Sequence, residues 1–282
     1  MNYKERYSIG DVSRICNISK KTLRYYDKIG LITTQRKDYN NYRFYTYDSL
    51  LAVPIIKYYK QMGFKLDEMR EFIEGNLSNV YRAIQKSFLA KIFELEKAQQ
   101  EIQLQYRSVR DWYDLVLEAE QVIDNTAHEV SVKYVEPVDL IFLEQTFEND
   151  IKDSIINIDF TNFVETQRNK ITGPVILNFS SFKDRMENQR QKIRILQKTL
   201  LPINEEVKTR IGGHIMAACY HIGAHETINE TYGKICRWAN DNGYILDKES
   251  IERYVTDYWT TSNSAQFVTE VMIKASRRGE NG

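Results

Sequence analysis

Cysteine is scarce in this chain of 282 residues, which contains only three. Cys16, Cys219 and Cys236 are isolated from one another, and no Cys-x-x-Cys pair occurs. The sequence therefore excludes a disulfide framework and a zinc site made of cysteines alone. No apolar run approaches the roughly 18 residues needed to cross a bilayer, and the charged segment Met1–Tyr7 lacks the apolar core of a signal peptide. We expect a cytoplasmic protein without a membrane partner.

The usual sequence signatures of catalysis are also missing. The chain has no Gly-x-Ser-x-Gly, no His-Glu-x-x-His and no glycine-rich loop that could hold a phosphate. His221 and His225 have the spacing of two metal ligands on a helix, but Gly223 lies between them. A third ligand is not evident beyond Glu226 or Cys219. The sequence thus predicts no catalytic residue, no metal site and no cofactor.

An excess of one charge sign is absent from the whole chain, with 39 Lys and Arg against 39 Asp and Glu. The charges are, however, unevenly distributed along the chain. Residues 1–65 carry 13 basic and 5 acidic residues, a net charge of +8, so the remainder carries −8. Such an asymmetry indicates a nucleic-acid or membrane contact at one end. The length suggests two domains, with a helix as a possible connector.

The N-terminal residues have the pattern of a small helical DNA-binding unit. Ser8 and Ser19 are good N-caps for two short helices, which predicts a helix-turn-helix. On the second helix, Lys20–Ile29, we expect Leu23 and Tyr26 to face the core. The outward residues carry the donors that phosphates and base edges require: Lys20, Thr22, Arg24 and Tyr25.

A wing is expected after this pair of helices. Ile32–Arg36 and Tyr42–Thr46 can pair as a short hairpin. Its aromatic residues are interleaved with basic side chains that suit a phosphate backbone, namely Arg36, Lys37 and Arg43. Two more helices are expected at about Tyr47–Met62 and Leu66–Glu74. The alternative interpretation is a solvated basic helical domain whose charge excess is incidental.

These motifs closely resemble the MerR family of transcription regulators. The resemblance covers residues 7–75 and is carried by Tyr7–Val12, by Thr22–Asp27 with Ile29–Leu31, by Asn41–Tyr45, and by Leu50–Phe64 with Leu66–Met69. It implies that residues 1–75 form a winged helix-turn-helix domain, whose partners are double-stranded promoter DNA and RNA polymerase. By the same resemblance, the recognition helix presents Thr22, Arg24 and Tyr25, the wing presents Tyr42 and Arg43, and Lys60 touches the DNA backbone beside the operator centre.

A long helix without glycine or proline is expected from Ser78 to about Gln121. Its apolar residues recur mostly in steps of three and four, as in a coiled-coil seam: Tyr81, Ile84, Phe88, Ile92, Leu95, Ile102, Tyr106, Val109, Tyr113 and Val116. About 40 residues make a helix of about 60 Å, which one small domain cannot cover. The alternative is a helix packed along its own domain. MerR relatives use the equivalent helix as an antiparallel dimer coil, which implies a homodimer with residues 76–121 as its dimerisation helix.

After Gln121 the pattern changes to the alternation of strands. Strands are expected at Val130–Val135, Ile141–Thr146, Gly173–Phe179, Gly212–His221, Ile251–Trp259 and Gln266–Ala275, with helices at about Ile158–Asn169 and His225–Asn242. This interleaving predicts an α+β domain over residues 122–282, with a mostly antiparallel sheet.

The segment Ile251–Trp259 is the most informative part of this domain. In a strand, one face carries Glu252, Tyr254, Thr256 and Tyr258. A carboxylate among aromatic rings is a receptor for a lipophilic cation, because each ring adds about 0.5–2 kcal/mol of cation–π attraction. The alternative is an exposed glutamate beside Arg253.

Residues 128–275 resemble the GyrI-like effector domain of multidrug-sensing MerR regulators, in the turn Gly212–His214, the strand end Cys219–Tyr220 and the segment Val271–Lys274. The resemblance implies that Glu252 lies at the base of the ligand pocket. Phe160 and Phe267 stand where those relatives carry tyrosines, and Ala265 stands where they carry a second acid, so we expect a more apolar pocket here. The complete predicted ligand-binding set is Glu252, Tyr254, Phe160, Phe163, Tyr220, Tyr258, Trp259 and Phe267.

The two resemblances together imply a ligand-responsive activator that senses small lipophilic, cationic aromatic compounds. Similar proteins bind promoters whose elements are spaced too widely for RNA polymerase, and they realign these elements by distorting the DNA. Two alternatives stay open. Some stand-alone GyrI-like domains are hydrolases that use a glutamate and a tyrosine. Related MerR sensors respond to metals through cysteines at the end of the dimer helix, but none occurs here between Gln105 and Ile123.

Overall fold

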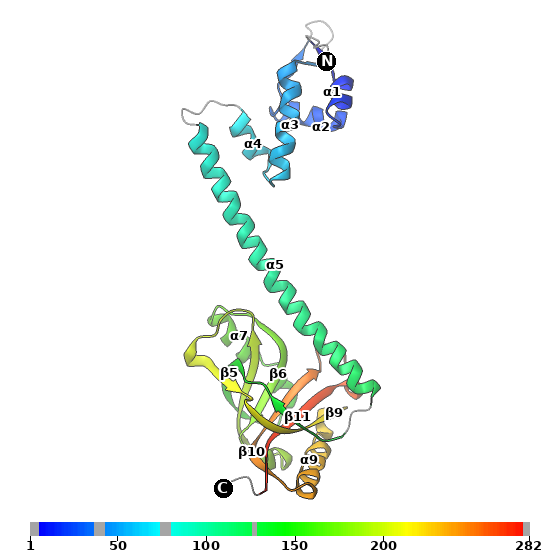
Figure 1. Ribbon diagram of the computed structural model, residues 1–282, viewed down its shortest axis with the longest axis vertical. Coiled ribbons are helices and arrows are strands. Elements are labelled where there is room, and N and C mark those ends of the chain that lie inside the picture. Colours follow the sequence, from blue (N-terminus) through cyan, green and yellow to red (C-terminus); the bar gives the residue numbers. More distant parts are fainter. Residues whose placement is uncertain (1–5, 37–42, 74–79, 126–128, 279–282) are drawn as a thin grey trace. The chain divides into compact units, whose positions relative to one another are not determined.

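The computed structural model describes residues 6–36, 43–73, 80–125 and 129–278 (Figure 1). The chain divides into two compact units, Met1–Glu101 and Ile102–Gly282, and helix α5 (Val80–Asp124) contributes residues to both. Lys37, Tyr42 and Ser78, which the sequence singled out, lie outside the described residues. No helix in the described part of the chain is both long enough and apolar enough to cross a membrane.

The first unit combines short helices with a small three-stranded sheet. Its elements before α5 are β1 (Tyr7–Ser8), α1 (Ile9–Ile15), α2 (Lys20–Lys28), β2 (Gln35–Arg36), β3 (Arg43–Tyr45), α3 (Tyr47–Gln61) and α4 (Leu66–Ile73). The strands pair antiparallel in the order β1-β3-β2. This arrangement confirms the predicted helix-turn-helix, hairpin and following helix pair.

Local hydrogen bonds explain where the first two helices begin. Ser8 Oγ accepts the N–H of Asp11 at 3.2 Å, and the Asp11 carboxylate accepts the N–H of Ser8 at 3.1 Å, which forms a capping box. Ser19 Oγ accepts the N–H of Thr22 at 3.0 Å at the start of α2. Leu23 and Tyr26 are buried in the core of this unit, as predicted. Their burial fixes which face of α2 is turned outward.

The second unit is an eight-stranded antiparallel sheet with helices on both faces. Its strands are β4 (Ser131–Val135), β5 (Val138–Phe147), β6 (Ile171–Phe179), β7 (Gln191–Thr199), β8 (Lys208–Ile211), β9 (His214–Ile222), β10 (Tyr244–Thr256) and β11 (Val268–Arg277). Its α-helices after α5 are α6 (Ile151–Ile155), α7 (Ile158–Thr166), α8 (Phe182–Met186) and α9 (Asn229–Asp241). The strand order is β4-β9-β11-β10-β6-β7-β5-β8. The predicted α+β class with an antiparallel sheet is confirmed.

Several boundaries differ from the sequence prediction. Strand β10 starts earlier than expected and ends at Thr256, so Tyr258 and Trp259 are not in a strand. The chain turns there because the carbonyl of Asp257 accepts the N–H of Thr260 at 3.0 Å and its side chain accepts the N–H of Trp259 at 3.1 Å. The elements β8, α6 and α8 were not predicted because each has only four or five residues. Strand β7 was also not predicted, although Ile193 and Ile195 alternate with Lys192 and Arg194.

One turn of the sheet requires glycine. Gly212, between β8 and β9, has φ of +85°, and a Cβ atom there would lie 2.4 Å from the carbonyl oxygen of Glu136. Only a residue without a side chain tolerates both conditions. The predicted turn at Gly212–His214 is thereby confirmed.

The two faces of the sheet are covered by different helices. Helix α9 packs on one face through Tyr232, and the C-terminal part of α5 packs on the other through Leu115 (Figure 1). Because side chains alternate along a strand, β10 directs Glu252 and Tyr254 towards α9, and Arg253 towards α5. The alternative of an exposed glutamate beside Arg253 is wrong, since Glu252 has an exposed fraction of 0%.

Candidate functional site

Most of the predicted DNA-binding residues described by the structure lie on the outer surface of the first unit. Lys20, Arg24 and Tyr25 are exposed on α2, and Thr22 is half-buried, with its hydroxyl 2.7 Å from that of Ser19. A basic and aromatic face is therefore presented by a helix whose opposite face is anchored in the core.

The wing is tied to this helix by an ion pair. Arg43 Nε on β3 donates to the carboxylate of Asp27 on α2 at 2.6 Å, and that carboxylate also accepts the hydroxyl of Thr34. Arg36 on β2 pairs with Arg43 in the strand register. Lys60 is exposed near the end of α3. The ion pair sets the orientation of the wing strand against the recognition helix.

Glu252 lies at the centre of a polar cluster inside the second unit. Its Oε1 accepts a hydrogen bond from Arg185 Nε at 2.9 Å and another from the Tyr232 hydroxyl at 2.9 Å. Its Oε2 accepts the hydroxyl of Tyr254. Burial raises the pKa of both tyrosines well above its usual range, so both hydroxyls remain donors. The carboxylate is satisfied by one cation and two phenols from its own chain.

The guanidinium of Arg185 occupies an aromatic cage. Its central carbon lies 5.4 Å from the ring centroid of Phe147 and 5.1 Å from that of Phe179. Burial by itself lowers the pKa of Arg185, but the Glu252 carboxylate together with Tyr254 and Tyr232 outweighs burial and raises it. A carboxylate and aromatic rings around a cation are what the sequence predicted for the ligand. Here the chain's own arginine is that cation.

Sequence reasoning missed Arg185 because α8 has only five residues. The available signal was the capping pattern Ser181-x-x-Asp184, in which Ser181 Oγ accepts the N–H of Asp184 at 3.2 Å. That pattern identifies the start of a helix. It does not indicate that Arg185 pairs with Glu252, because these two residues are 67 positions apart in the sequence.

A cavity of about 470 Å³ lies beside Arg185 and is also lined by His225, Asn229 and Tyr258. His225 stacks on Phe267, with ring centroids 5.0 Å apart, and contacts the rings of Tyr254 and Tyr258 at their edges. Neither ring nitrogen of His225, nor Oδ1 of Asn229, has a hydrogen-bond partner among the described residues. Burial lowers the pKa of His225 to about 4, so its imidazole is neutral at pH 7.

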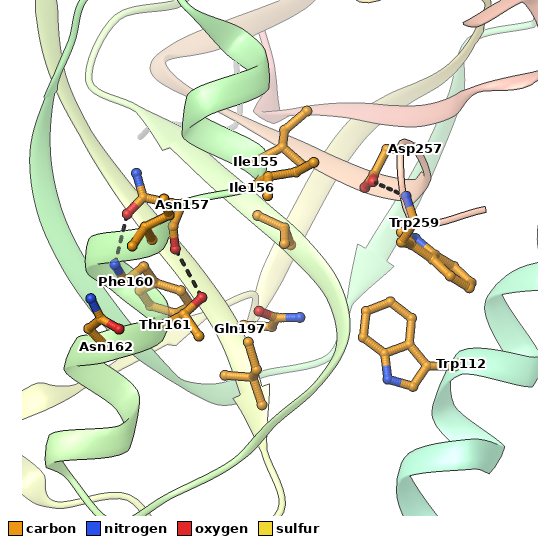
Figure 2. Close-up of a pocket in the computed structure, with 13 residues that line it drawn as sticks. Trp112, Ile155, Ile156, Asn157, Phe160, Thr161, Asn162, Gln197, Asp257 and Trp259 are labelled. Atoms are coloured by element: carbon orange, nitrogen blue, oxygen red, sulfur yellow. Dashed lines mark hydrogen bonds between the residues drawn. The ribbon is translucent and has the colours of Figure 1, made fainter. Parts of the chain in front are cut away.

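A second cavity of about 320 Å³ is walled by α5, α7 and the segment that follows β10 (Figure 2). Trp112 of α5 and Trp259 meet on one side with ring centroids 4.6 Å apart, and Phe160 of α7 lies on the other. Gln197 of β7 also lines the cavity. Its amide nitrogen donates to the carbonyl of Gly173 at 2.7 Å, whereas its Oε1 has no hydrogen-bond partner among the described residues.

Asp257 contributes a carboxylate to this second cavity. Its exposed fraction is 2%, and it accepts the backbone N–H of Trp259 at 3.1 Å. Burial raises the pKa of Asp257 to about 6, an effect that the Trp259 N–H reduces. No cation of the described residues forms an ion pair with it. The sequence did not single out Asp257, because a strand through Trp259 would have placed it on the face away from Glu252.

The predicted ligand-binding residues are thus distributed over different places. Glu252, Tyr254, Tyr258 and Phe267 gather around Arg185 and His225, while Phe160 and Trp259 line the second cavity. Phe163 lies on α7 and packs, partly buried, at the edge of the core. Tyr220 lies on the α5 face of the sheet, where its hydroxyl donates to Glu118 at 2.8 Å. The prediction that Tyr220 joins Glu252 is not met, because the alternation of β9 turns it to the other face.

Charged residues connect α5 to the sheet on that face. Arg253 of β10 donates to Glu118 of α5 at 3.1 Å and to Glu270 of β11 at 2.9 Å, and Lys133 of β4 also pairs with Glu270. The C-terminal part of α5 is therefore attached to β10 by an ion pair, which continues within the sheet through Glu270 to Lys133, and α5 also packs on the sheet through apolar side chains.

Among the residues considered for a metal or redox site, His221 has hydrogen-bond partners and the Cys219 thiol has a raised pKa. Nδ1 of His221 lies 3.0 Å from the Thr231 hydroxyl, and Nε2 lies 2.9 Å from the carbonyl of Ala224. Within the described ranges, no group of three or more His, Cys, Asp or Glu side chains could hold a metal ion. Burial raises the pKa of the Cys219 thiol to about 11, which disfavours the reactive thiolate.

Comparison with known proteins gives two family matches. The GyrI-like small molecule binding domain matches residues 128–275, and the MerR family regulatory protein matches residues 8–45. The chain is 26% identical over 291 residues to the multidrug-efflux transporter 2 regulator of Bacillus subtilis, covering 96% of this chain and 97% of that protein. It is 30% identical over 142 residues to the multidrug-efflux transporter 1 regulator of the same organism, covering 46% of this chain and 51% of that protein.

Among solved structures, the EcmrR–DNA complex determined by cryo-electron microscopy aligns with a TM-score of 0.46 at 20% identity. That alignment covers 96% of this chain and all of the EcmrR chain.

Proposed function

Since the chain belongs to the family of the GyrI-like small molecule binding domain and carries a MerR family regulatory domain at its N-terminus, we propose how it couples a small molecule to transcription. The dimer binds promoter DNA through α2 and the wing, and an aromatic effector binds in the second unit. The observation that carries this proposal is the outward face of α2, where Lys20, Arg24 and Tyr25 are exposed opposite a buried seam. These exposed side chains do not pack in the core of their own unit, so they are available to bind DNA.

DNA contacts in this proposal follow the geometry of α2 and the wing. Arg24 and Lys20 supply donors for base edges and phosphates, and Tyr25 supplies a hydroxyl and an aromatic surface. Arg43 reaches the DNA backbone while Asp27 fixes its position. Thr22, Arg36, Tyr42 and Lys60 complete the proposed contact set. The net charge of +8 on residues 1–65 makes the affinity depend on salt.

A homodimer is proposed because α5 leaves an apolar stripe uncovered. Apolar residues are exposed along it at steps of three and four, with one step of seven between Leu95 and Ile102: Ile92, Leu95, Ile102, Tyr106, Val109, Tyr113 and Val116. Phe88 differs, since it packs on Phe64 of its own unit with ring centroids 5.3 Å apart. An antiparallel coiled coil with a second copy covers the stripe, and paired recognition helices then read two half-sites.

Activation in this proposal acts through the shape of DNA. The dimer binds a promoter whose elements are spaced too widely for RNA polymerase, and the effector favours the state that bends and untwists the DNA. The effector supplies only its difference in affinity for the two states. Because the protein must reach promoter DNA in this proposal, we propose that it is located in the cytoplasm.

A regulator without enzymatic activity fits the Glu252 cluster. A glutamate that acts as a general base must be free to take a proton. Glu252 is instead held by Arg185 and by the hydroxyls of Tyr232 and Tyr254. We therefore propose that neither Glu252 nor the tyrosines beside it perform hydrolysis. Unchanged mass spectra of bound aromatic probes after prolonged incubation would agree with this assignment.

Arg24→Ala tests the DNA assignment. A duplex selected by the wild-type protein from a random-sequence library serves as the operator in gel-shift titrations. We expect the variant to lose about 10- to 100-fold in affinity, because a bidentate arginine–base contact contributes about 1–3 kcal/mol. Arg70→Ala, which removes an exposed arginine of α4 paired with Asp67, should bind within about twofold of wild type. Equal affinity of wild type and Arg24→Ala would reject the assignment.

A further inference from the structure

We propose that the carboxylate that receives a lipophilic aromatic cation in this chain is Asp257, in the second cavity, and not Glu252. The ligand lies against Trp112 and Trp259, with Phe160 on the opposite wall (Figure 2). This inference rests on the proposed function, in which an effector binds the second unit, and it assigns the chemical class of that effector and its site.

Glu252 is excluded by its existing partner. Arg185 pairs with it at 2.9 Å, and both side chains are almost completely buried. A ligand cation would have to displace a guanidinium that is also held between the rings of Phe147 and Phe179. If the ligand left that guanidinium in place, two positive charges would share one carboxylate in a buried site. The cation receptor around Glu252 is therefore already filled.

Asp257 has the opposite property, because it is a buried acid that no cation in the described part of the chain neutralises. It receives one backbone hydrogen bond, from Trp259, and it lines an open cavity. A buried carboxylate gains most from a partner of opposite charge. A cationic ligand supplies that partner, and the protein does not have to give up an existing ion pair.

The other walls of the cavity suit an aromatic cation. The two indoles provide faces and edges for stacking, and indole is the strongest cation–π partner among the side chains. Gln197 is held by Gly173 through its amide nitrogen, which leaves Oε1 as a fixed acceptor for a donor on the ligand. The volume of about 320 Å³ lies at the lower end of the range of small-molecule pockets. A compact compound of about three fused rings therefore fits best.

The position of Trp112 allows a bound ligand to connect α5 to the sheet. Trp112 lies on α5, the proposed dimerisation helix, whereas Asp257 and Trp259 follow β10. A ligand that contacts all three residues joins α5 to the sheet at a point separate from the Glu118–Arg253 ion pair. Binding therefore changes how firmly this part of α5 is held. The cavity beside His225 has no lining residue from α5.

Binding of two matched probes to the full-length protein tests the proposal. N-methylacridinium is a permanent cation, and N-methylacridone is an uncharged compound with the same three rings. Fluorescence quenching of Trp112 and Trp259 is followed in a Trp238→Phe background, which removes the third tryptophan of the chain. We expect Asp257→Asn to weaken N-methylacridinium at least tenfold and to change N-methylacridone less than twofold. The retained binding of N-methylacridone also shows that the cavity is intact.

Glu226→Gln is the matched control, since it removes one exposed negative charge from the lining of the cavity beside His225. It should leave the affinity of both probes unchanged. If Glu226→Gln weakens the cation and Asp257→Asn does not, the cation binds in the other cavity and the proposal is wrong. Equal losses of both probes in Asp257→Asn also overturn it. Failure of both probes to bind any of the proteins would instead reject the effector-binding function of this unit.

The pH dependence of binding is a second measurement on the same proteins. Because the pKa of Asp257 is raised to about 6, its carboxyl group becomes neutral as the pH falls through 6. We expect the affinity for N-methylacridinium to fall over that range, while N-methylacridone and the Asp257→Asn protein show no such change. A pH-independent affinity of the wild type for the cation would contradict the assignment.

Other charged groups near the cavity have partners or are exposed to solvent. On α5 and β7, Asp111 and Lys198 pair with each other at 2.8 Å. On α6 and α7, Lys152, Asp153 and Asp159 are exposed. Among the described residues that line the cavity, Asp257 is the only acid or base, so the pH dependence can be assigned to it.

Discussion

Arg185→Ala is expected to lower the free energy of unfolding of the second unit by about 3–5 kcal/mol. Removing one partner of a buried ion pair leaves the other charge without compensation, and losses of this size are typical. Glu252 would keep the hydroxyls of Tyr232 and Tyr254 but would lose its cation in a site with an exposed fraction of 0%. The rings of Phe147 and Phe179 would also lose the guanidinium packed between them.

Chemical unfolding followed by tryptophan fluorescence measures this loss directly, because Trp112, Trp238 and Trp259 all belong to the second unit. The double variant Arg185→Met with Glu252→Gln should recover most of the stability. It removes both charges. The amide oxygen can accept the Tyr254 hydroxyl, and the amide nitrogen can donate to the Tyr232 hydroxyl, which can itself donate to Ser250 Oγ.

Arg190→Ala is the control for loss of an arginine. This residue forms an exposed ion pair with Glu148 at 2.7 Å, which should contribute less than about 1 kcal/mol. A stability of Arg185→Ala within 1 kcal/mol of the wild type would contradict the importance of the buried pair. A double variant no more stable than the single one would show that the loss comes from packing rather than from an uncompensated charge.

Tyr106→Glu combined with Val109→Glu is expected to convert the proposed dimer to a monomer. Both side chains lie on the uncovered stripe of α5, with exposed fractions of 63% and 69%. Burial of each apolar side chain contributes about 1.5–3 kcal/mol, and each occurs twice in a symmetric dimer. The dissociation constant should therefore rise by at least about a thousandfold, before repulsion between the introduced carboxylates is added. Sedimentation velocity measures the change.

The matched control for this variant is Gln100→Glu. Gln100 is exposed on α5 but is not part of the apolar stripe, so its substitution should leave the dimer unchanged. The monomeric variant should also lose most of its operator affinity, because a single recognition helix reads only one half-site. If the double variant remained dimeric, the stripe would not be the dimer interface, and the proposed arrangement of the two DNA-binding units would have to be abandoned.

The Glu252 and Asp257 sites show how one receptor chemistry occurs twice in the second unit. Around Glu252, the carboxylate, the aromatic rings and the cation all come from the chain, and the result is a stable core. Around Asp257, the chain supplies the carboxylate and the rings, none of the described residues supplies a cation, and a cavity remains. The difference depends on α8, which brings Arg185 to one carboxylate and not to the other.

Local patterns in the sequence were enough to predict the first unit. Ser8 and Ser19 cap helices because a serine hydroxyl accepts an N–H three residues later, and Leu23 and Tyr26 are buried because their spacing follows the helical period. These interactions join residues that are close in sequence. The class of the second unit was predictable for a similar reason, since alternating polarity marks strands wherever one face is buried.

Most of the elements and the chemistry of their side chains could therefore be read from the sequence: an acid among aromatic residues, a basic recognition helix and a long apolar stripe. Which acid has a cation depends on the tertiary structure. The Arg185–Glu252 pair joins residues 67 positions apart, and the turn after Thr256 moves Asp257 and Trp259 away from Glu252 and towards Trp112. Periodicity gives the direction of a side chain from its own element. Its partner depends on how elements distant in sequence pack together, and that is set by the whole sheet.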